Sequence, residues 1–222
     1  MKIQILGSDA AFDGLNTSFF FKDDIGRGVL VDCGFTVFPE LVRRKMVGDV
    51  DVVLISHLHA DHTGSLTTLA VYNRSRLKKK PIVGGDNVAE LFKVQGVLPD
   101  DFIPLSADDP LHLCVIKTGH IPAYGYNYGL FIADRILFSG DTNEPLLDTE
   151  FAAKAKIILH EATLAEPTFH SNIEILARAK PEIKAKTWLI HIPTEERADI
   201  ERDAVAKYGF AGVCHNGQVI EV

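Results

Sequence analysis

One short segment of this 222-residue chain concentrates side chains that bind metal ions in proteins. The apolar run Val50–Ile55 reads as a buried strand, and a polar segment follows it directly. His57 and His59 are two positions apart, so both imidazoles project the same way as the strand ends. Asp61 and His62 follow at the next turn. Two pairs of ligands aimed at neighbouring points favour two adjacent metal ions; the alternative is a polar loop whose histidines only hydrogen-bond or face solvent.

Three further candidate ligands each stand just past a later apolar run. They are His120, Asp141 and His191. Functional side chains of α/β proteins collect where strands end, and a glycine before His120 and before Asp141 lets the backbone turn closely beneath a site. Together with the first segment, the chain offers five His and two Asp. That set suits two metal ions with about four to six ligands each, once a water is added.

The chain reads as alternating strands and helices, and we therefore predict an α/β fold. The predicted strands are Lys2–Leu6, Thr17–Lys22, Gly28–Asp32, Val50–Ile55, Pro81–Gly85, His112–Lys117, Tyr126–Ile132, Arg135–Phe138, Ile157–Leu159 and Thr187–Ile192. The predicted helices are Phe38–Met46, Thr63 to about Arg74, a helix capped by Asp86 or Asn87 that runs through Val94, Pro145–Lys154, Asn172–Ala179 and Glu195–Tyr208. Two strand-rich halves of this kind predict sheets packed on each other with helices outside. We expect one domain over residues 1–222, with halves of roughly 1–111 and 112–222.

Composition limits the classes of function and the location. The formal net charge of −7 argues against a general nucleic-acid binder, which usually has a basic surface. No apolar stretch approaches the roughly 18 residues that span a bilayer, and the first residues are too soon polar for a signal peptide. The three cysteines form no close pair, which is typical of free thiols in a reducing compartment. We therefore expect a cytoplasmic protein with no membrane partner.

In their order along the chain, these motifs resemble those of the metallo-β-lactamase superfamily of hydrolases. A His-x-His-x-Asp-His loop, a later lone His, an Asp within Ser-Gly-Asp-Thr and a final His occur over nearly the whole sequence. The resemblance implies a four-layer αββα sandwich with the site at one edge, between the halves. It also implies two ligand sets: His57, His59 and His120 for one metal, and Asp61, His62 and His191 for the second, with Asp141 bridging both.

Within that superfamily the chain is similar to ribonuclease Z-like phosphodiesterases. The similar segments are Leu6–Phe12, Asn16–Ser18, Val31–Gly34, His160–Leu164 and His170-Ser171. The resemblance implies that His170 is the general acid that protonates the leaving oxygen, and we expect Asp61 and Glu161 to be catalytic residues as well. We expect His160 and Glu161 to hydrogen-bond to ligands or to His170. On sequence alone, His170 also fits an exposed loop histidine, whereas His112 and His215 have no such setting and are expected to be structural.

The chain departs from ribonuclease Z in ways that narrow the choice of substrate. Those enzymes carry a long arm for tRNA between the lone His and the bridging Asp, but only 21 positions separate His120 from Asp141 here. Asn172 stands where a Thr follows His-Ser, and Pro193 replaces a Ser after the last ligand. Compact relatives without the arm include cyclic-nucleotide phosphodiesterases, among them the phage anti-Pycsar type, and the chain is similar to these in size and motifs.

The sequence therefore predicts a dinuclear phosphodiesterase acting on a small phosphodiester, with a cyclic nucleotide as the candidate substrate. A metal-bound hydroxide would attack and His170 would protonate the leaving group. The two divalent metals are expected to be zinc, with manganese or iron as alternatives. The other hypotheses are a tRNA 3′-end endonuclease, a hydrolase of carboxylic esters, lactones or thioesters, and a metal-binding module without catalysis. The resemblance also implies a homodimer.

The sequence leaves the roles of two features open. The basic run Arg74–Lys80 reads as a solvated helix end, and the alternative is contact with a substrate phosphate. Tyr124, Tyr126 and Tyr128 alternate along the predicted hairpin after His120. They fit packing or, in the alternative, stacking of one ring on a base.

Overall fold

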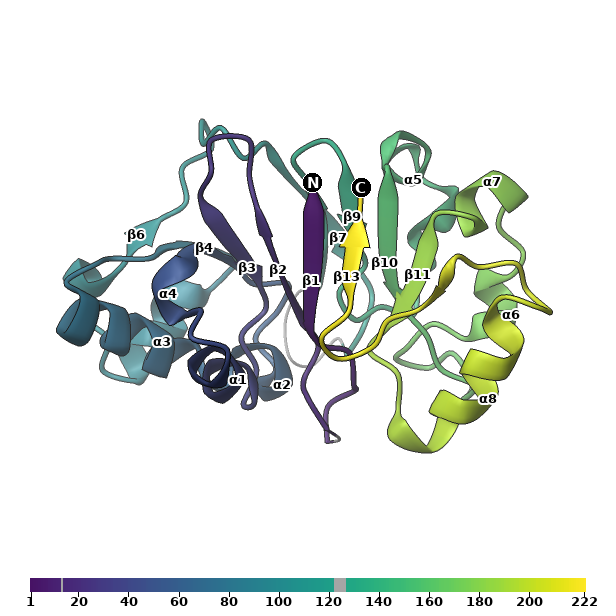
Figure 1. The fold of residues 1–222 in the computed structure, drawn as a ribbon, viewed down its shortest axis with the longest axis horizontal. Helices are drawn as coiled ribbons and strands as arrows, with labels where there is room; N and C mark the ends of the chain where they lie inside the picture. Colours follow the sequence, from purple (N-terminus) through teal and green to yellow (C-terminus); the bar gives the residue numbers. More distant parts are fainter. Residues whose placement is uncertain (13, 122–126) are drawn as a thin grey trace. The chain divides into compact units, whose positions relative to one another are not determined.

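The computed structural model describes residues 1–12, 14–121 and 127–222. The chain divides into two compact units (Figure 1): one comprises Met1–Asp109 with Asn216–Val222, and the other comprises Pro110–His215. Tyr124 and Tyr126, two of the three alternating tyrosines, lie outside the described residues. The prediction of one domain stays a prediction, and each unit is described by itself.

The first unit is built on a sheet with the strand order β13-β1-β2-β3-β4-β5-β6. β1, β2 and β3 pair antiparallel, β13 pairs antiparallel with β1, and β3 to β6 run parallel. The strands are β1 (Lys2–Gly7), β2 (Ser18–Lys22), β3 (Gly28–Val31), β4 (Val50–Leu54), β5 (Ile82–Gly84), β6 (Ile103–Pro104) and β13 (Val219–Glu221).

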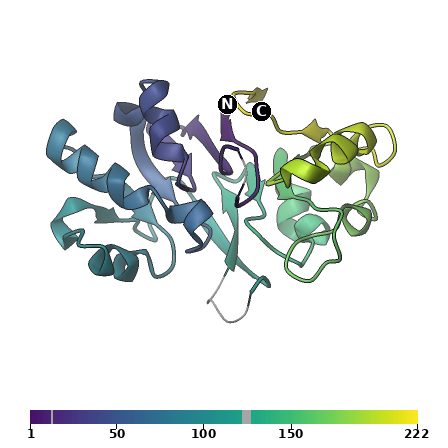
Figure 2. The ribbon, with the colours of Figure 1, turned by 90° about the horizontal axis from the view of Figure 1, so that it is seen from below.

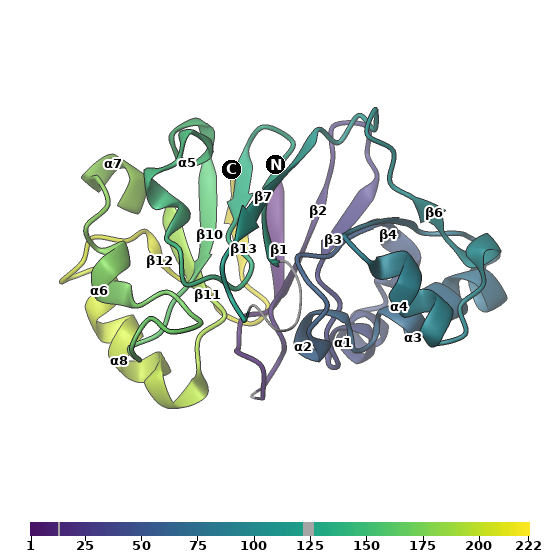
Figure 3. The ribbon, with the colours of Figure 1, turned by 180° about the vertical axis from the view of Figure 1, so that it is seen from behind.

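Helices cover one face of this first sheet (Figures 1 and 3). Leu41 of α1, Leu69 of α3 and Phe92 of α4 share a buried core with Leu30 and Val53 of the strands. The other face of the same strands is buried as well, which explains why they read as nearly continuous apolar runs. The helices are α1 (Val37–Arg43), η1 (Val47–Asp49), α2 (Ala60–Thr63), α3 (Leu66–Tyr72), the π-helix η2 (Asn73–Leu77), α4 (Val88–Val94) and η3 (Pro99–Asp101).

The second unit has a sheet with the order β12-β11-β10-β9-β8-β7, in which β9 to β12 are parallel and β7, β8 and β9 pair antiparallel. Its helices pack on one face around Ile158, Leu176 and Leu189 (Figure 2). The strands are β7 (Leu113–Thr118), β8 (Asn127–Ile132), β9 (Ile136–Phe138), β10 (Ile157–Glu161), β11 (Thr187–Ile190) and β12 (Gly212–Val213). The helices are η5 (Leu146–Asp148), α5 (Glu150–Lys154), α6 (Ile173–Leu176), α7 (Pro181–Lys184) and α8 (Thr194–Ala204).

Several boundaries differ from the sequence prediction. The helix predicted from Thr63 to about Arg74 begins later, as α3 at Leu66, and a separate short helix, α2, covers Ala60–Thr63. The segment predicted as one helix from Pro145 is a 3-10 turn followed by α5, because Thr149 caps α5 by accepting a hydrogen bond from the Ala152 N–H. Among the described residues, no helix combines the length and the apolar character that crossing a membrane requires.

Candidate metal centre

In the first unit, four predicted ligands follow β4 within one short segment. The ring centroids of His57 and His59 are 4.6 Å apart, and those of His57 and His62 are 4.1 Å apart. Asp61 and His62 lie on α2 and not in a turn before a helix, so the helix itself carries two of the candidate ligands. His57, Asp61 and His62 are buried. These nitrogen and oxygen donors are of the kind that zinc, manganese and iron accept.

A buried carboxylate fixes the orientation of these rings. Asp32, just past β3, accepts hydrogen bonds from the Ser56 N–H at 2.8 Å and the Ser56 hydroxyl at 2.9 Å. Its other contact is His62 Nδ1, at 2.8 Å. His57 Nδ1 likewise lies 3.1 Å from Ser56 Oγ. Because Nδ1 is engaged in both rings, Nε2 is the nitrogen that would bind a metal.

Asp32 was not among the predicted site residues. Burial raises the pKa of its carboxyl, and the neighbouring His62 and Ser56 oppose that rise. Its backbone is left-handed, with φ of 57°, a conformation that costs free energy in a non-glycine residue. A buried, strained acid held between two elements of a candidate site is a supporting group for the ligands.

Asp32→Ala is expected to destabilise the fold. The Ser56 and His62 donors would lose their acceptor, and each such loss costs about 1–3 kcal/mol. A loss of about 2 kcal/mol corresponds to a fall in Tm of roughly 4–8 °C for a chain of this size. Thermal unfolding measures the change, and Asp24→Ala, at an exposed turn position, is the matched control. A Tm equal to that of the control would contradict the supporting role of Asp32.

In the second unit, the strand ends bring the remaining ligands together. Asp141 follows β9 and His191 follows β11, and β10 between them runs parallel to both, so their carboxyl ends meet at one edge. Asp141 Oδ2 lies 3.4 Å from His191 Nε2 and 3.8 Å from His120 Nε2. All three residues are buried. A carboxylate next to two imidazole nitrogens is a donor set of the kind that holds a metal ion.

His120 is oriented by the backbone of a neighbouring loop. Its Nδ1 lies 2.7 Å from the Phe169 carbonyl oxygen. Because a carbonyl only accepts, Nδ1 carries the hydrogen and Nε2 is the nitrogen that would bind a metal. The predicted lone histidine therefore has the ring orientation that a ligand needs.

His170 and Glu161 form a close pair beside Asp141. His170 Nδ1 is 2.5 Å from Glu161 Oε2, and the Thr142 N–H donates to Glu161 Oε1. One ligand atom from each of Asp141, Glu161, His170 and His191 lies within 4.8 Å of the others. Burial raises the pKa of the Glu161 carboxyl above its ordinary value, the hydrogen bond from His170 opposes this, and the nearby Asp141 charge adds to the rise.

His160 has a different setting from the one expected. Its Nδ1 donates to the Glu161 carbonyl at 2.8 Å, and its Nε2 accepts from the Leu146 N–H at 3.3 Å. Burial lowers the pKa of this histidine to about 4, so the ring is neutral near pH 7. Both of these partners are backbone groups, and His160 therefore links the end of β10 to the segment before α5.

The other residues singled out by sequence lie apart from these clusters. His112 is exposed and 3.2 Å from Asp134, and His215 lies 3.7 Å from Glu201. All three cysteines are free. In the basic run 74–80, three of the five cations have acidic neighbours: Arg74 pairs with Asp101, Lys79 with Asp51 and Lys80 with Asp100. These pairs offset much of the charge that a phosphate contact would use.

Comparison with solved structures defines the class of fold. The chain superposes on the metallo-β-lactamase fold protein YhfI from Bacillus subtilis with a TM-score of 0.76, at 18% identity, covering 99% of this chain and 98% of that one. A diphosphatase of the PhnP family gives a TM-score of 0.72 at 18% identity, covering 100% and 97% of the two chains. The molecule is a metallo-β-lactamase fold protein of mixed α/β class with two sheets, as the sequence predicted.

Comparison of sequences identifies the family within this class of fold. The chain belongs to the family of the anti-Pycsar protein Apyc1, whose model matches residues 1–87 and 83–220. It is 30% identical over 220 residues to the anti-Pycsar protein Apyc1 of Paenibacillus sp. (strain J14), covering 86% of this chain and 89% of that one. The corresponding protein of Bacillus phage BSP38 is 25% identical over 217 residues, covering 82% and 84%. The predicted resemblance is confirmed, and the fold and the His and Asp clusters together suggest a metal-dependent hydrolase.

Proposed function

We propose that this protein is a dinuclear metal-dependent phosphodiesterase that hydrolyses a small phosphodiester, specifically a cyclic nucleotide. Membership of the anti-Pycsar Apyc1 family supports the class of substrate. The observation that carries the chemistry is the His170–Glu161 pair beside Asp141. A cyclic nucleotide opens by releasing an alkoxide, which is a poor leaving group and needs a proton donor.

The proposal assigns seven His and Asp side chains as the metal ligands. The orientation of His57, His62 and His120 by partners at Nδ1 supports this set. When bound, the ions would supply a nucleophilic water and stabilise the developing phosphate charge. Zinc is the proposed metal, and manganese and iron suit the same donors. The ligands are His57, His59, Asp61, His62, His120, Asp141 and His191.

The protein's own side chains would deliver the proton to the leaving oxygen. Glu161 holds His170 through Nδ1, which leaves Nε2 as the atom that donates to the leaving oxygen. The carboxylate also stabilises the protonated imidazole that the donor step requires. Asp61, on α2, is the remaining proposed catalytic residue, through its place among the metal ligands.

A substrate panel tests the proposed class. Metal-reconstituted protein is expected to open one or more cyclic mononucleotides, and the products are resolved by chromatography beside cyclic dinucleotides and precursor tRNA. Because the chain carries a net charge of −7, we expect only a shallow dependence of KM on salt. Cleavage of precursor tRNA with a steep salt dependence, or turnover of lactones alone, would replace the proposal with one of those activities.

Location and assembly are also proposals. We propose a cytoplasmic homodimer, as the family resemblance implies. Light scattering of the purified protein measures the mass in solution, and a monomer at all concentrations would contradict the dimer.

A further inference from the structure

The loop that carries His170 is closed at its base by the backbone. It runs from Leu164 to His170, between β10 and α6. The Thr163 N–H donates to the Ser171 carbonyl at 3.0 Å, and the Ile173 N–H donates to the Thr163 carbonyl at 2.9 Å. These bonds fix where the loop starts and ends but leave the residues between them to other contacts.

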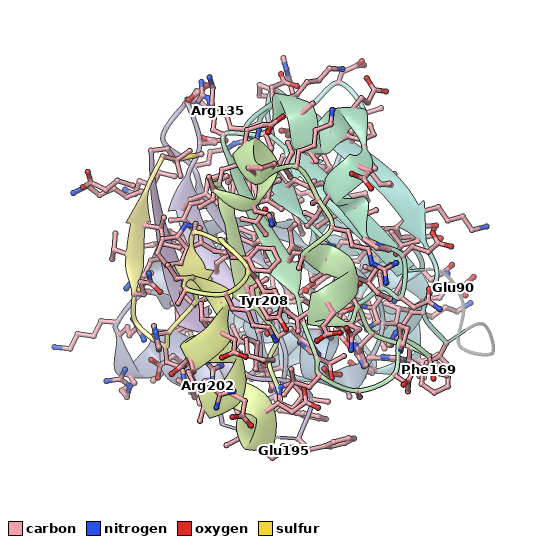
Figure 4. All side chains as sticks on the ribbon, turned by 90° about the vertical axis from the view of Figure 1, so that its right-hand side faces the viewer. Glu90, Arg135, Phe169, Glu195, Arg202 and Tyr208 are labelled. Atoms are coloured by element: carbon pink, nitrogen blue, oxygen red, sulfur yellow. The ribbon has the colours of Figure 1, made fainter. Side chains whose placement is uncertain are left out.

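Apolar burial does little to hold these intervening residues. The loop's two large apolar side chains, Leu164 and Phe169, are 41% and 44% exposed. Figure 4 shows Phe169 at the surface of the loop. A segment with few buried apolar contacts keeps one conformation only if polar contacts hold it.

Asn172 supplies such contacts from a position two residues after His170. Its Nδ2 donates to the Leu164 carbonyl at 3.0 Å and to the Ala165 carbonyl at 2.9 Å. Its Oδ1 accepts from the Glu174 N–H at 2.8 Å and so caps α6. The amide therefore has two separate tasks: its oxygen caps the helix, and its nitrogen ties the loop's start to the loop's end.

Further side chains hold the far part of the same loop. Asn143 Nδ2 donates to the Thr168 carbonyl at 3.0 Å, and His120 contacts the Phe169 carbonyl. Glu196 accepts from the Leu164 N–H at 2.6 Å. Backbone groups at four of the six residues before His170 are thus bonded to side chains, and Asn172 accounts for two of the four carbonyls.

We propose that Asn172 is a positioning residue that keeps His170 in place for proton donation through its Nδ2 donor bonds. This inference rests on the proposed function. The ribonuclease Z-like pattern has Thr at this position, and a Thr hydroxyl could cap α6 but has too few donors to bridge two carbonyls. Asn172 therefore bonds the start of the loop in addition to capping α6, whereas a Thr could only cap the helix.

Asn172→Asp separates the two tasks. Aspartate keeps the oxygen that caps α6, and it has no N–H for the Leu164 and Ala165 carbonyls. A displacement of about 1 Å can cost roughly 10²-fold in rate, so we expect turnover of a cyclic nucleotide to fall about 10- to 100-fold. Turnover of bis(4-nitrophenyl) phosphate, whose leaving group needs little acid help, is expected to stay within about twofold. Amide hydrogen exchange of residues 164–170 is expected to become faster, with metal content unchanged.

Asn216→Asp is the matched control, because it also loses an amide donor bond, at 3.0 Å to Asp9, in the other unit. It is expected to lower the Tm without changing the ratio of the two turnover rates. An unchanged ratio of the two turnover rates in Asn172→Asp, whether both rates fall equally or neither falls, would overturn the positioning role. This holds even if His170→Ala loses turnover on the cyclic nucleotide alone. If His170→Ala shows no leaving-group dependence either, the proposed function falls, and this inference falls with it.

Discussion

His170→Ala is expected to lower turnover of a cyclic nucleotide by about 10²- to 10⁴-fold while keeping the metals. The reason is the chemistry of the leaving group: an alkoxide needs the proton that His170 would donate, whereas a nitrophenolate leaves without it. The loss on bis(4-nitrophenyl) phosphate is therefore expected to be much smaller. Steady-state kinetics on both esters, with metal content measured by mass spectrometry, gives the comparison.

The control for this variant is another histidine that lies away from the cluster. His215 is exposed and near Glu201, so His215→Ala is expected to leave both rates unchanged. Equal losses on both esters in His170→Ala would remove the assignment of the acid. Loss of metal in the same variant would instead make His170 a metal ligand. Metal content is measured because a ring nitrogen of His170 lies within 4.8 Å of the ligand atoms of Asp141 and His191.

Asp141→Asn is expected to abolish metal-dependent turnover and weaken metal binding. Changing a residue that only supports a ligand lowers metal affinity or activity by about 10- to 100-fold. Changing a carboxylate that binds the metal directly is expected to lower them further. Metal binding to the folded state alone raises stability, so added zinc should raise the Tm of the unaltered protein and have little effect on this variant. The readouts are metal content per chain and Tm with and without zinc.

Asp134→Asn is the matched control, since Asp134 is exposed and pairs with the exposed His112. We expect it to bind metal and respond to zinc like the unaltered protein. An Asp141→Asn protein with full metal content and normal turnover would exclude Asp141 as a bridging ligand.

Residues that follow strands were predictable from the sequence because strand ends are readable as the ends of apolar runs. His120, Asp141 and His191 each lie where such a run predicted. The clustering of Asp141 with His191 follows from the parallel pairing of β9, β10 and β11, which places their ends at one edge.

Asp32 was missed because its partners are far away in sequence. A single acid after a strand has no spacing that marks it as functional. Its role follows from the pairing of β3 with β4, which sets Val31 beside Leu54 and brings Asp32 to Ser56. The start of α2 was missed for a related reason: four residues are too few to show helical periodicity.

The last strand also could not be predicted from local sequence patterns. β13 is three residues long and returns to pair with β1, and the Met1 amino group lies 2.8 Å from the Val222 carbonyl oxygen. Local hydrophobic periodicity carries no information on a pairing between the two ends of a chain. Non-local contacts thus decided what the sequence left open, in this strand and at Asp32.

The three thiols differ sharply in environment. Burial raises the pKa of Cys33 to about 12 and raises that of Cys214 as well, whereas Cys114 on β7 is exposed. Alkylating reagents attack the thiolate, so they discriminate among cysteines by access and acidity. A maleimide fluorophore should therefore label the unaltered sequence at Cys114, six positions before His120, and provide an optical probe on the strand that leads to this histidine.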